Sequence, residues 1–243
     1  MRVPRIHTLQ PLSPGRSLTL DELSAHHVRQ VLRLRAGDPV RLFTPEGEEF
    51  AAQLTLVSKQ AVQADLGEQL RHEPAPALGI HLMIGISRGE RMDFALQKAT
   101  ELGVTRITPL LTQRCVVKLD EKKRSSRMDH WYKVVINACE QSGRCRVPQL
   151  DEPRELSVAL GEALPGHALL LDHRSEKTLA DLSPPNCSVS LLIGPEGGLA
   201  PEEREQALGQ GFQGVRLGPR VLRTETAPLA AIAAIQTLWG DFN

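Results

Sequence analysis

Apolar and polar residues alternate in two different ways along this chain, and the change falls near residue 70. Before it, runs in which every second residue is apolar predict short strands at 18–20, 39–43, 50–57 and 61–66. A helical pattern at 22–34, which Asp21 can cap, lies among them. After it, strand patterns at 78–86, 104–111, 168–171, 188–193 and 215–217 alternate with helical patterns at 90–102, 127–141, 201–208 and 227–239. This alternation predicts an α/β unit whose parallel sheet is covered on both faces.

Residues 67–77 separate the two patterns. They place Pro74 and Pro76 among charged residues, a composition typical of a linker. We therefore expect two domains, a small and mostly β domain at 1–72 and a larger α/β domain at 73–243. The chain of 243 residues is long enough for each domain to bury a core.

Two segments in the last quarter of the chain share one design. Residues 191–199 and 217–227 each begin with an apolar run that stops at a glycine, continue with polar residues, and lead into a helical pattern. Parallel sheets form ligand crevices at such strand-to-helix turns, where backbone N–H groups are free. A single glycine turn is often only a tight connection. The pair is harder to explain that way, because the first holds Glu196 among glycines and the second holds Arg220, Arg223 and Glu225.

At these two segments the chain resembles the SPOUT methyltransferases, and within them the bacterial enzymes that methylate N3 of a uridine in 16S ribosomal RNA. The similarity extends to residues 1–5, 31–33, 87–90 and 140–144. It implies a PUA-like β-barrel at 1–72 that binds RNA, and a SPOUT domain with a C-terminal trefoil knot at 73–243. It also implies S-adenosylmethionine as cofactor, bound by Leu171, His173, Ile193, Gly194, Glu196, Gly197, Gly198, Leu217, Gly218, Val221, Leu222, Arg223 and Thr226.

The chemistry that the resemblance implies needs a base and a stabiliser of negative charge. N3 of uracil must lose its proton before it accepts a methyl group, and the charge then spreads onto two carbonyl oxygens. An arginine suits those oxygens and a carboxylate suits the proton, so Arg223 and Glu225 are the catalytic candidates. The alternative for this pair is an ion pair at the start of a helix.

The charge distribution permits an RNA partner without requiring one. The net charge is zero, but residues 1–44 hold seven lysines and arginines against three acidic residues, and residues 114–127 hold six against two. The basic residues of the 22–34 helix can also be an ordinary solvated face. With the resemblance, the expected RNA contacts are Arg2, Arg5, Arg29, Arg33, Arg88 and Arg114.

Two further features of the sequence have simpler explanations. Residues 209–214 match the dinucleotide fingerprint G-x-G-x-x-G, but they follow a helix and precede a strand, the reverse of the order that fingerprint needs, so we do not expect NAD binding. Ala200 stands where a Ser or Thr would cap the 201–208 helix, which forgoes about 1 kcal/mol. Pro201, Glu202 and Glu203 partly offset that loss, and we expect it to affect stability only.

The four cysteines show no metal-binding spacing, so we expect reduced thiols and no metal. The start of the chain lacks a signal-peptide pattern and no apolar run approaches a membrane span, so we expect a cytoplasmic protein. The 227–239 helix is apolar nearly all round, which together with the resemblance predicts a homodimer.

Other functions remain open from the sequence. A SPOUT enzyme that methylates ribose 2′-hydroxyls would carry the same cofactor segments, and a non-catalytic RNA-binding or assembly protein could keep the fold. The sequence also leaves open whether the substrate is naked 16S rRNA or the assembled small ribosomal subunit.

Overall fold

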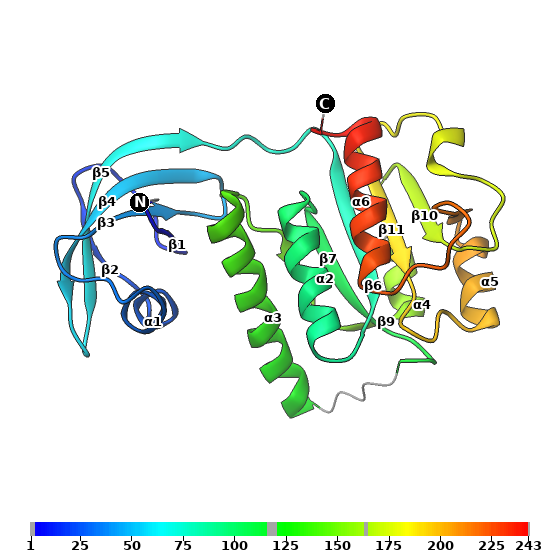
Figure 1. Cartoon of the computed structure of the whole chain (residues 1–243), viewed down its shortest axis with the longest axis horizontal. Helices are drawn as coiled ribbons and strands as arrows, with labels where there is room; N and C mark the ends of the chain where they lie inside the picture. Colours follow the sequence, from blue (N-terminus) through cyan, green and yellow to red (C-terminus); the bar gives the residue numbers. More distant parts are fainter. Residues whose placement is uncertain (1–2, 116–120, 163–164, 243) are drawn as a thin grey trace. The chain divides into compact units, whose positions relative to one another are not determined.

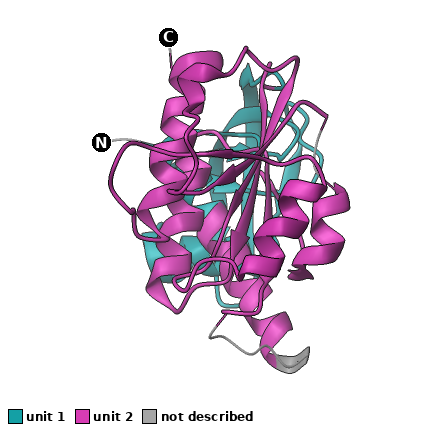
Figure 2. Ribbon diagram, turned by 90° about the vertical axis from the view of Figure 1, so that its right-hand side faces the viewer, with its two compact units in different colours: residues 1–75, 136–147 teal, residues 76–135, 148–243 magenta. Residues whose placement is uncertain are grey.

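The computed structural model describes residues 3–115, 121–162 and 165–242. The chain folds into two compact units (Figure 2). The first comprises Met1–Ala75 together with Ile136–Val147, and the second comprises Pro76–Val135 and Pro148–Asn243. The boundary after residue 75 lies close to the one we expected at 72, but the first unit also includes a segment from the middle of the chain.

The first unit is built on a five-stranded sheet. Its strands are β1 (Arg5–His7), β2 (Ser17–Thr19), β3 (Pro39–Phe43), β4 (Glu48–Val57) and β5 (Val62–His72), in the order β1-β3-β4-β5-β2 (Figure 1). β1 pairs with β3 in parallel, and the other neighbours are antiparallel. Our linker prediction was wrong for residues 67–72, because these residues continue β5 and pair with β4 as far as His72.

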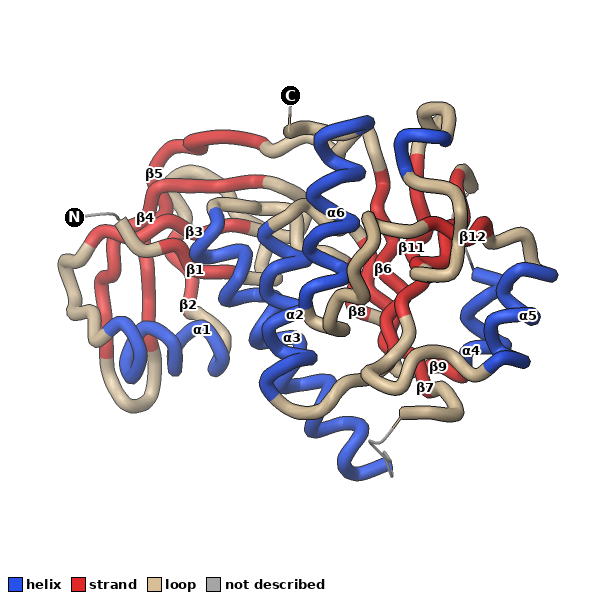
Figure 3. The backbone as a smooth tube through the Cα atoms, turned by 45° about the vertical axis from the view of Figure 1, so that its right-hand side comes forward, coloured by secondary structure: helices blue, strands red, loops and turns tan. Residues whose placement is uncertain are grey.

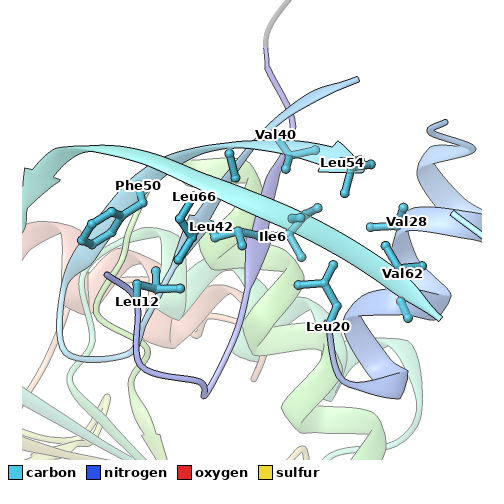
Figure 4. Packing of buried hydrophobic residues seen from close by; sticks show 13 residues of the cluster. Ile6, Leu12, Leu20, Val28, Val40, Leu42, Phe50, Leu54, Val62 and Leu66 are labelled. Carbon is cyan, nitrogen blue, oxygen red and sulfur yellow. The ribbon is translucent and has the colours of Figure 1, made fainter. Parts of the chain in front are cut away.

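One face of this sheet packs on a hydrophobic core. Figure 4 shows the side chains of Ile6, Leu42, Phe50 and Leu66, all from strands, in one cluster with Leu20. These side chains are almost completely shielded from solvent. The alternation that predicted the strands follows from this arrangement, since every second side chain points to the core.

The predicted helix at 22–34 is present but not regular. It begins as α1 (Glu22–His26), and the Asp21 carboxylate accepts a hydrogen bond from the Ser24 N–H at 2.9 Å, as the capping pattern predicted. It then widens into a π-helix, η1 (His27–Leu32), which ends at Arg33. Arg33 has φ of 53°, the only positive φ among the described residues other than glycine. Such a conformation is uncommon for a side-chain-bearing residue.

A network of charged groups attaches the segment 136–147 to the rest of the first unit. The buried Arg5 pairs with Glu49 at 2.6 Å, and its remaining N–H groups donate to the carbonyl oxygens of Cys139 and Arg144. Arg71 pairs with the other Glu49 oxygen at 2.7 Å. Guanidinium groups thus donate to carbonyl groups at and just beyond the C-terminal end of a helix, where basic side chains commonly bind.

The second unit contains a seven-stranded sheet in which every pairing is parallel. Its strands are β6 (Gly79–Gly85), β7 (Arg106–Leu111), β8 (Gln149–Leu150), β9 (Arg154–Glu155), β10 (His167–Leu171), β11 (Ser188–Ile193) and β12 (Gln213–Val215). The order is β12-β10-β11-β6-β7-β8, and β9 also pairs with β7. The predicted parallel sheet is confirmed. The two-residue strands β8 and β9 were not predicted.

Helices lie on both faces of this sheet (Figure 3). The helices of this unit are α2 (Glu90–Glu101), α4 (Leu156–Ala159), α5 (Pro201–Gly209) and α6 (Thr226–Trp239), the part of α3 (Glu121–Ser142) before Ile136, and the short turns η2 (Leu160–Glu162) and η3 (Leu179–Asp181). α2 packs beside α6, and α4 packs beside α5. Met83, Leu170 and Leu192 face α4 and α5 in one core cluster. The strands are apolar on both faces because both faces are covered.

Candidate active site

A cavity of about 300 Å³ opens where three neighbouring strands of the second unit end. Its walls are the segments that follow β10, β11 and β12, together with one residue that follows β7. In a parallel sheet the carboxyl ends of the strands lie at one edge, so the loops that leave them gather there. The two glycine-containing segments that the sequence analysis singled out both line this cavity.

Ten of the residues predicted to bind a cofactor line the cavity. They are Leu171, His173, Ile193, Gly194, Glu196, Gly197, Gly198, Leu217, Val221 and Leu222. Gly218, Arg223 and Thr226 belong to the same loop and to the start of α6, but they are not part of the wall. Gly218 has φ of 68°, so it provides the left-handed turn in this loop.

The loop after β11 is folded tightly against its surroundings, and glycines make this possible. A Cβ atom on Gly194 would lie 2.8 Å from the Leu199 nitrogen, and one on Gly197 would lie 3.1 Å from the Cβ of Arg114. Gly198 has φ of 67°. The backbone therefore lines the cavity closely, with no side chain between it and a ligand.

Glu196 joins this loop to the start of α2. Its Oε1 accepts hydrogen bonds from the Arg88 N–H at 3.2 Å and from Nη1 of Arg91 at 3.3 Å. Burial tends to raise the pKa of Glu196, but these hydrogen bonds and one from its own backbone N–H outweigh burial and lower the pKa. The carboxylate is therefore ionised at neutral pH and holds the loop in place.

The structure adds cavity residues that were not among the predicted cofactor contacts, although several of them lie in the two glycine-containing segments. They are Leu170, Asp172, Arg174, Pro195, Leu199, Arg204, Arg220, Thr224 and Ala227. Asp172 carried a usable signal, since it is the first polar residue after a buried strand. Arg204 carried none, because it is one of several charged residues on a surface helix.

Asp172 is fixed in the cavity wall by two hydrogen bonds. Its Oδ2 accepts a hydrogen bond from Nε of Arg204 at 2.5 Å, and its Oδ1 accepts one from the Arg174 N–H at 3.0 Å. Burial tends to raise the pKa of Asp172, but these hydrogen bonds outweigh it and lower the pKa. Asp172 and Arg204 therefore form a charged pair in the wall.

The two catalytic candidates lie at the entrance to α6. Nη1 of Arg223 is 4.0 Å from Oε1 of Glu225, and the Arg223 side chain is 81% exposed. The carbonyl of Arg223 accepts hydrogen bonds from the N–H groups of Thr226 and Ala227, which fixes its backbone at the first turn of the helix. Thr224, between the two candidates, is buried and lines the cavity.

The candidate RNA contacts fall into different environments. Arg2 lies outside the described residues. Arg5 is buried and its N–H groups bind Glu49 and backbone carbonyls, so we no longer propose it as an RNA contact. Arg29 binds Glu22 and the carbonyls of Ser58 and Lys59, and its side chain is only 15% exposed.

The other three candidates are exposed. Arg33 is exposed on the first unit, and Arg88 and Arg114 are exposed on the second. Arg114 lines the cavity and donates from Nη1 to the carbonyl of Gly197 at 3.1 Å.

Other parts of the second unit agree with the sequence interpretation. The segment 209–214 ends α5 and leads into a strand, as predicted, with Gly211 in the turn at φ of 89°, but β12 covers Gln213–Val215 rather than the predicted 215–217. Among the described residues, no cluster of three or more histidines, cysteines and acidic residues is arranged to hold a metal ion. The described helices include none with the length and apolarity that a membrane crossing requires.

Comparison with known proteins gives a consistent result. The RNA methyltransferase domain family matches residues 73–236, and the RNA methyltransferase PUA domain family matches residues 20–67. A Buchnera aphidicola protein named ribosomal RNA small subunit methyltransferase E is 31% identical over all of this chain and 96% of its own length.

Two solved structures are each 40% identical to this chain and align with it over the full length of both proteins. One is a ribosomal RNA small subunit methyltransferase E from Neisseria gonorrhoeae bound to S-adenosyl methionine, with a TM-score of 0.91. The other is a Legionella pneumophila protein in complex with the bound cofactor SAM, with a TM-score of 0.95. With its fold, its cavity at the strand ends and these matches along its whole length, the chain belongs to the family of RNA methyltransferases that carry an N-terminal PUA domain.

Proposed function

We propose that this protein transfers a methyl group from S-adenosylmethionine to N3 of a specific uridine in 16S ribosomal RNA. The family and its relatives make it an rRNA methyltransferase that uses S-adenosylmethionine, and the uridine-N3 specificity is the further step. The observation that supports it most is the cavity formed by the loop after β11 and the loop that leads to Arg223 and Glu225.

The residues in the cavity wall fit the proposed cofactor. Leu171, Ile193 and Leu222 offer an apolar surface for an adenine ring, and the glycine loop places backbone groups where no Cβ could stand. S-adenosylmethionine supplies a methyl group already activated by a sulfonium, so the protein has mainly to orient the reactants. The cavity volume is within the usual range for small-molecule sites.

Arg223 and Glu225 are the proposed catalytic residues. In this mechanism Glu225 removes the proton from N3, and the Arg223 guanidinium stabilises the charge that develops on the uracil oxygens. The exposure of Arg223 supports this role, because its donors remain free to meet a base that enters from solvent. The backbone hydrogen bonds that fix the start of α6 hold both residues in position.

Arginines around the cavity support an RNA substrate. Arg114, Arg174 and Arg220 come from three different loops, line the cavity and are exposed. A backbone phosphate next to the target nucleotide is the group that such exposed arginines bind. In the first unit, Arg33 is the remaining exposed candidate for a phosphate contact.

We also propose that the working unit is a homodimer, in which α6 contributes to the interface. Leu238 on α6 is 46% exposed and Phe94 on the neighbouring α2 is 44% exposed, which is high for apolar side chains on packed helices. Ala231 and Ile235 are buried within the chain, so Leu238→Glu is the better test. Light scattering should show a dimer for the wild type and a monomer for this variant; a monomeric, active wild type would contradict the proposal.

The decisive experiment is mass spectrometry of rRNA nucleosides from a strain that lacks the gene. Our proposal predicts the loss of one 3-methyluridine from 16S rRNA and its return on complementation. Loss of a ribose-methylated nucleoside would indicate the 2′-O alternative, and an unchanged profile would indicate a non-catalytic role. Methyl transfer to naked 16S rRNA and to small subunits, measured side by side, would identify the substrate form. The trefoil knot that accompanies the SPOUT assignment stays a prediction.

A further inference from the structure

Glu203 on α5 is a buried carboxylate that binds two separate segments. Its Oε2 accepts a hydrogen bond from the Ala200 N–H at 2.8 Å, at the start of its own helix. Its Oε1 accepts one from the Gln113 N–H, also at 2.8 Å, in the segment that follows β7. Capping of α5 explains the first contact, since Ala200 has no polar side chain. It does not explain the second, which joins residues ninety positions apart.

The contact with Gln113 leads directly to the cavity. The next residue, Arg114, donates to the carbonyl of Gly197 at 3.1 Å, and the Cβ of Arg114 lies where a Cβ on Gly197 would almost touch it. Glu203 therefore fixes the backbone from which Arg114 reaches, and Arg114 in turn holds the glycine loop. The position of one cavity wall depends on a carboxylate that does not line the cavity itself.

Arg204, the next residue on α5, holds a second wall. Its Nε donates to Asp172 at 2.5 Å, and both residues line the cavity. The Asp172 N–H also donates to the Val215 carbonyl at 2.8 Å, which connects the end of β10 to the end of β12. Two consecutive side chains of one helix thus bind the segments that follow β7 and β10.

We propose that Glu203 and Arg204 are positioning residues for the cofactor, which together keep the cavity loops in the arrangement that binds S-adenosylmethionine. This inference rests on the proposed function. When a binding-competent arrangement is populated only in part, the apparent dissociation constant rises by the inverse of that fraction. The two residues raise affinity by keeping this fraction close to one before the ligand arrives.

The chain provides matched controls for Glu203. Glu202 and Glu205 lie on the same helix and are exposed, so Glu202→Gln and Glu205→Gln make the same chemical change and remove the same charge. Glu203→Gln keeps the size of the side chain but turns an amide NH₂ toward one of the two backbone N–H donors. We expect calorimetry to show roughly tenfold weaker S-adenosylmethionine binding for Glu203→Gln and wild-type affinity for both controls.

Melting temperatures separate positioning from simple stabilisation. A positioning role predicts that the rise in melting temperature on adding S-adenosylmethionine is smaller in Glu203→Gln than in wild type. A stabilising role alone predicts a lower melting temperature for the free protein with an unchanged dissociation constant, and that result would overturn the proposal. Equal weakening in all three glutamine variants would also overturn it. If the wild type itself fails to bind S-adenosylmethionine, the proposed function fails instead.

Arg204 provides a second, independent test of the proposal, since it is half-buried and its replacement should leave the fold intact. We expect Arg204→Gln and Asp172→Asn each to raise the KM for S-adenosylmethionine severalfold, with a smaller effect on kcat. The double variant should be no worse than the more affected single variant, because both remove the same contact. A folded Arg204→Gln enzyme with wild-type KM would overturn this part of the proposal.

Discussion

Two arginines of the first unit and three at or near the cavity of the second unit perform different tasks. In the first unit, Arg5 and Arg29 donate to carboxylates and backbone carbonyls of their own unit. In the second unit, Arg174, Arg220 and Arg223 are exposed beside the cavity or at the entrance to α6. The surplus of basic residues in 1–44 suggested an RNA-binding face, yet part of that surplus stabilises the fold. A count of charges therefore says less about partners than the number of donors that the fold leaves free.

The largest effect should come from a buried arginine of the first unit. Arg5→Ala leaves the Glu49 carboxylate buried with one guanidinium partner and removes the donors that Arg5 offers to the carbonyls of Cys139 and Arg144. Breaking a buried ion pair costs about 3–5 kcal/mol, so we expect this loss in the free energy of unfolding, measured with urea. Arg16→Ala, the same change at an exposed position of the same unit, serves as the control. A loss below about 1 kcal/mol would mean that Arg5 is not structural.

An exposed arginine of the second unit should behave in the opposite way. Arg223→Ala removes an exposed side chain whose one ion-pair contact is 4.0 Å long, so the melting temperature should stay unchanged. The methyl-transfer rate at saturating RNA and cofactor should fall about 10²- to 10³-fold, as when one donor to a developing charge is removed. Normal turnover would show that Arg223 takes no part in the reaction, and the contrast between structural and catalytic arginines would fail.

Carboxyl groups extend the comparison. Asp172 in the second unit binds a guanidinium and has a lowered pKa, whereas burial raises the pKa of Glu140 in the first unit to about 7. The Glu140 carboxyl accepts from the His7 N–H and lies 3.5 Å from Nε2 of His27, whose pKa burial lowers. At pH 7 about half of the Glu140 carboxyl groups therefore keep their proton and His27 is mainly neutral, and we interpret this contact as a hydrogen bond rather than a full ion pair.

The raised pKa of Glu140 gives a pH-dependent prediction. A carboxyl whose pKa is higher in the folded state stabilises the fold below its ordinary pKa of 4.5, and this contribution is lost as pH rises through about 7. Glu140→Gln imitates the protonated form, so it should be more stable than wild type above pH 7, by up to about 3 kcal/mol. The difference should shrink toward pH 4.5. A difference in melting temperature between the two proteins that stays the same from pH 4.5 to 8 would contradict this prediction.

The smallest effects should come from two arginines close together in the first unit. Arg33→Gln removes an exposed charge, and Arg29→Gln removes one whose donors are already used. Each lost phosphate contact lowers the salt dependence of RNA binding by roughly one unit of slope. We expect this reduction for Arg33→Gln alone, measured by filter binding across salt concentrations. A reduction for Arg29→Gln alone would reverse our assignment.

The strands of the second unit were predictable because their sequence and their environment agree. β11 is buried at every position, and four of its six residues are apolar with Gly194 directly after them, a pattern typical of a covered parallel strand. β8 and β9 have two residues each and exist only because β7 offers free hydrogen-bonding groups. The π-helix at His27–Leu32 was equally hidden, since residues of this stretch also fit a regular helix.

The candidate site was predictable to a similar extent. Glycines at strand ends revealed the cavity because a backbone that must approach a ligand or a neighbouring loop cannot carry a Cβ. Glu203 and Arg204 gave no such signal. Their partners Gln113 and Asp172 are distant in the sequence, and a glutamate next to an arginine on a surface helix is ordinary. Only the three-dimensional structure shows that Glu203 and Arg204 bind the segments that follow β7 and β10.

The first unit is made of two separate segments of the chain, and this affects when it can fold during synthesis. Its network needs Cys139 and Arg144, which leave the ribosome about seventy residues after Ala75. At a synthesis rate of about 5–20 residues per second, the first unit waits several seconds with Arg5 and Glu49 lacking these partners. The first unit therefore cannot complete its fold during this interval, although most of its residues are synthesised first. Pulse proteolysis of stalled nascent chains should find protection of this unit only when residue 147 has emerged, and protection at residue 75 would contradict it.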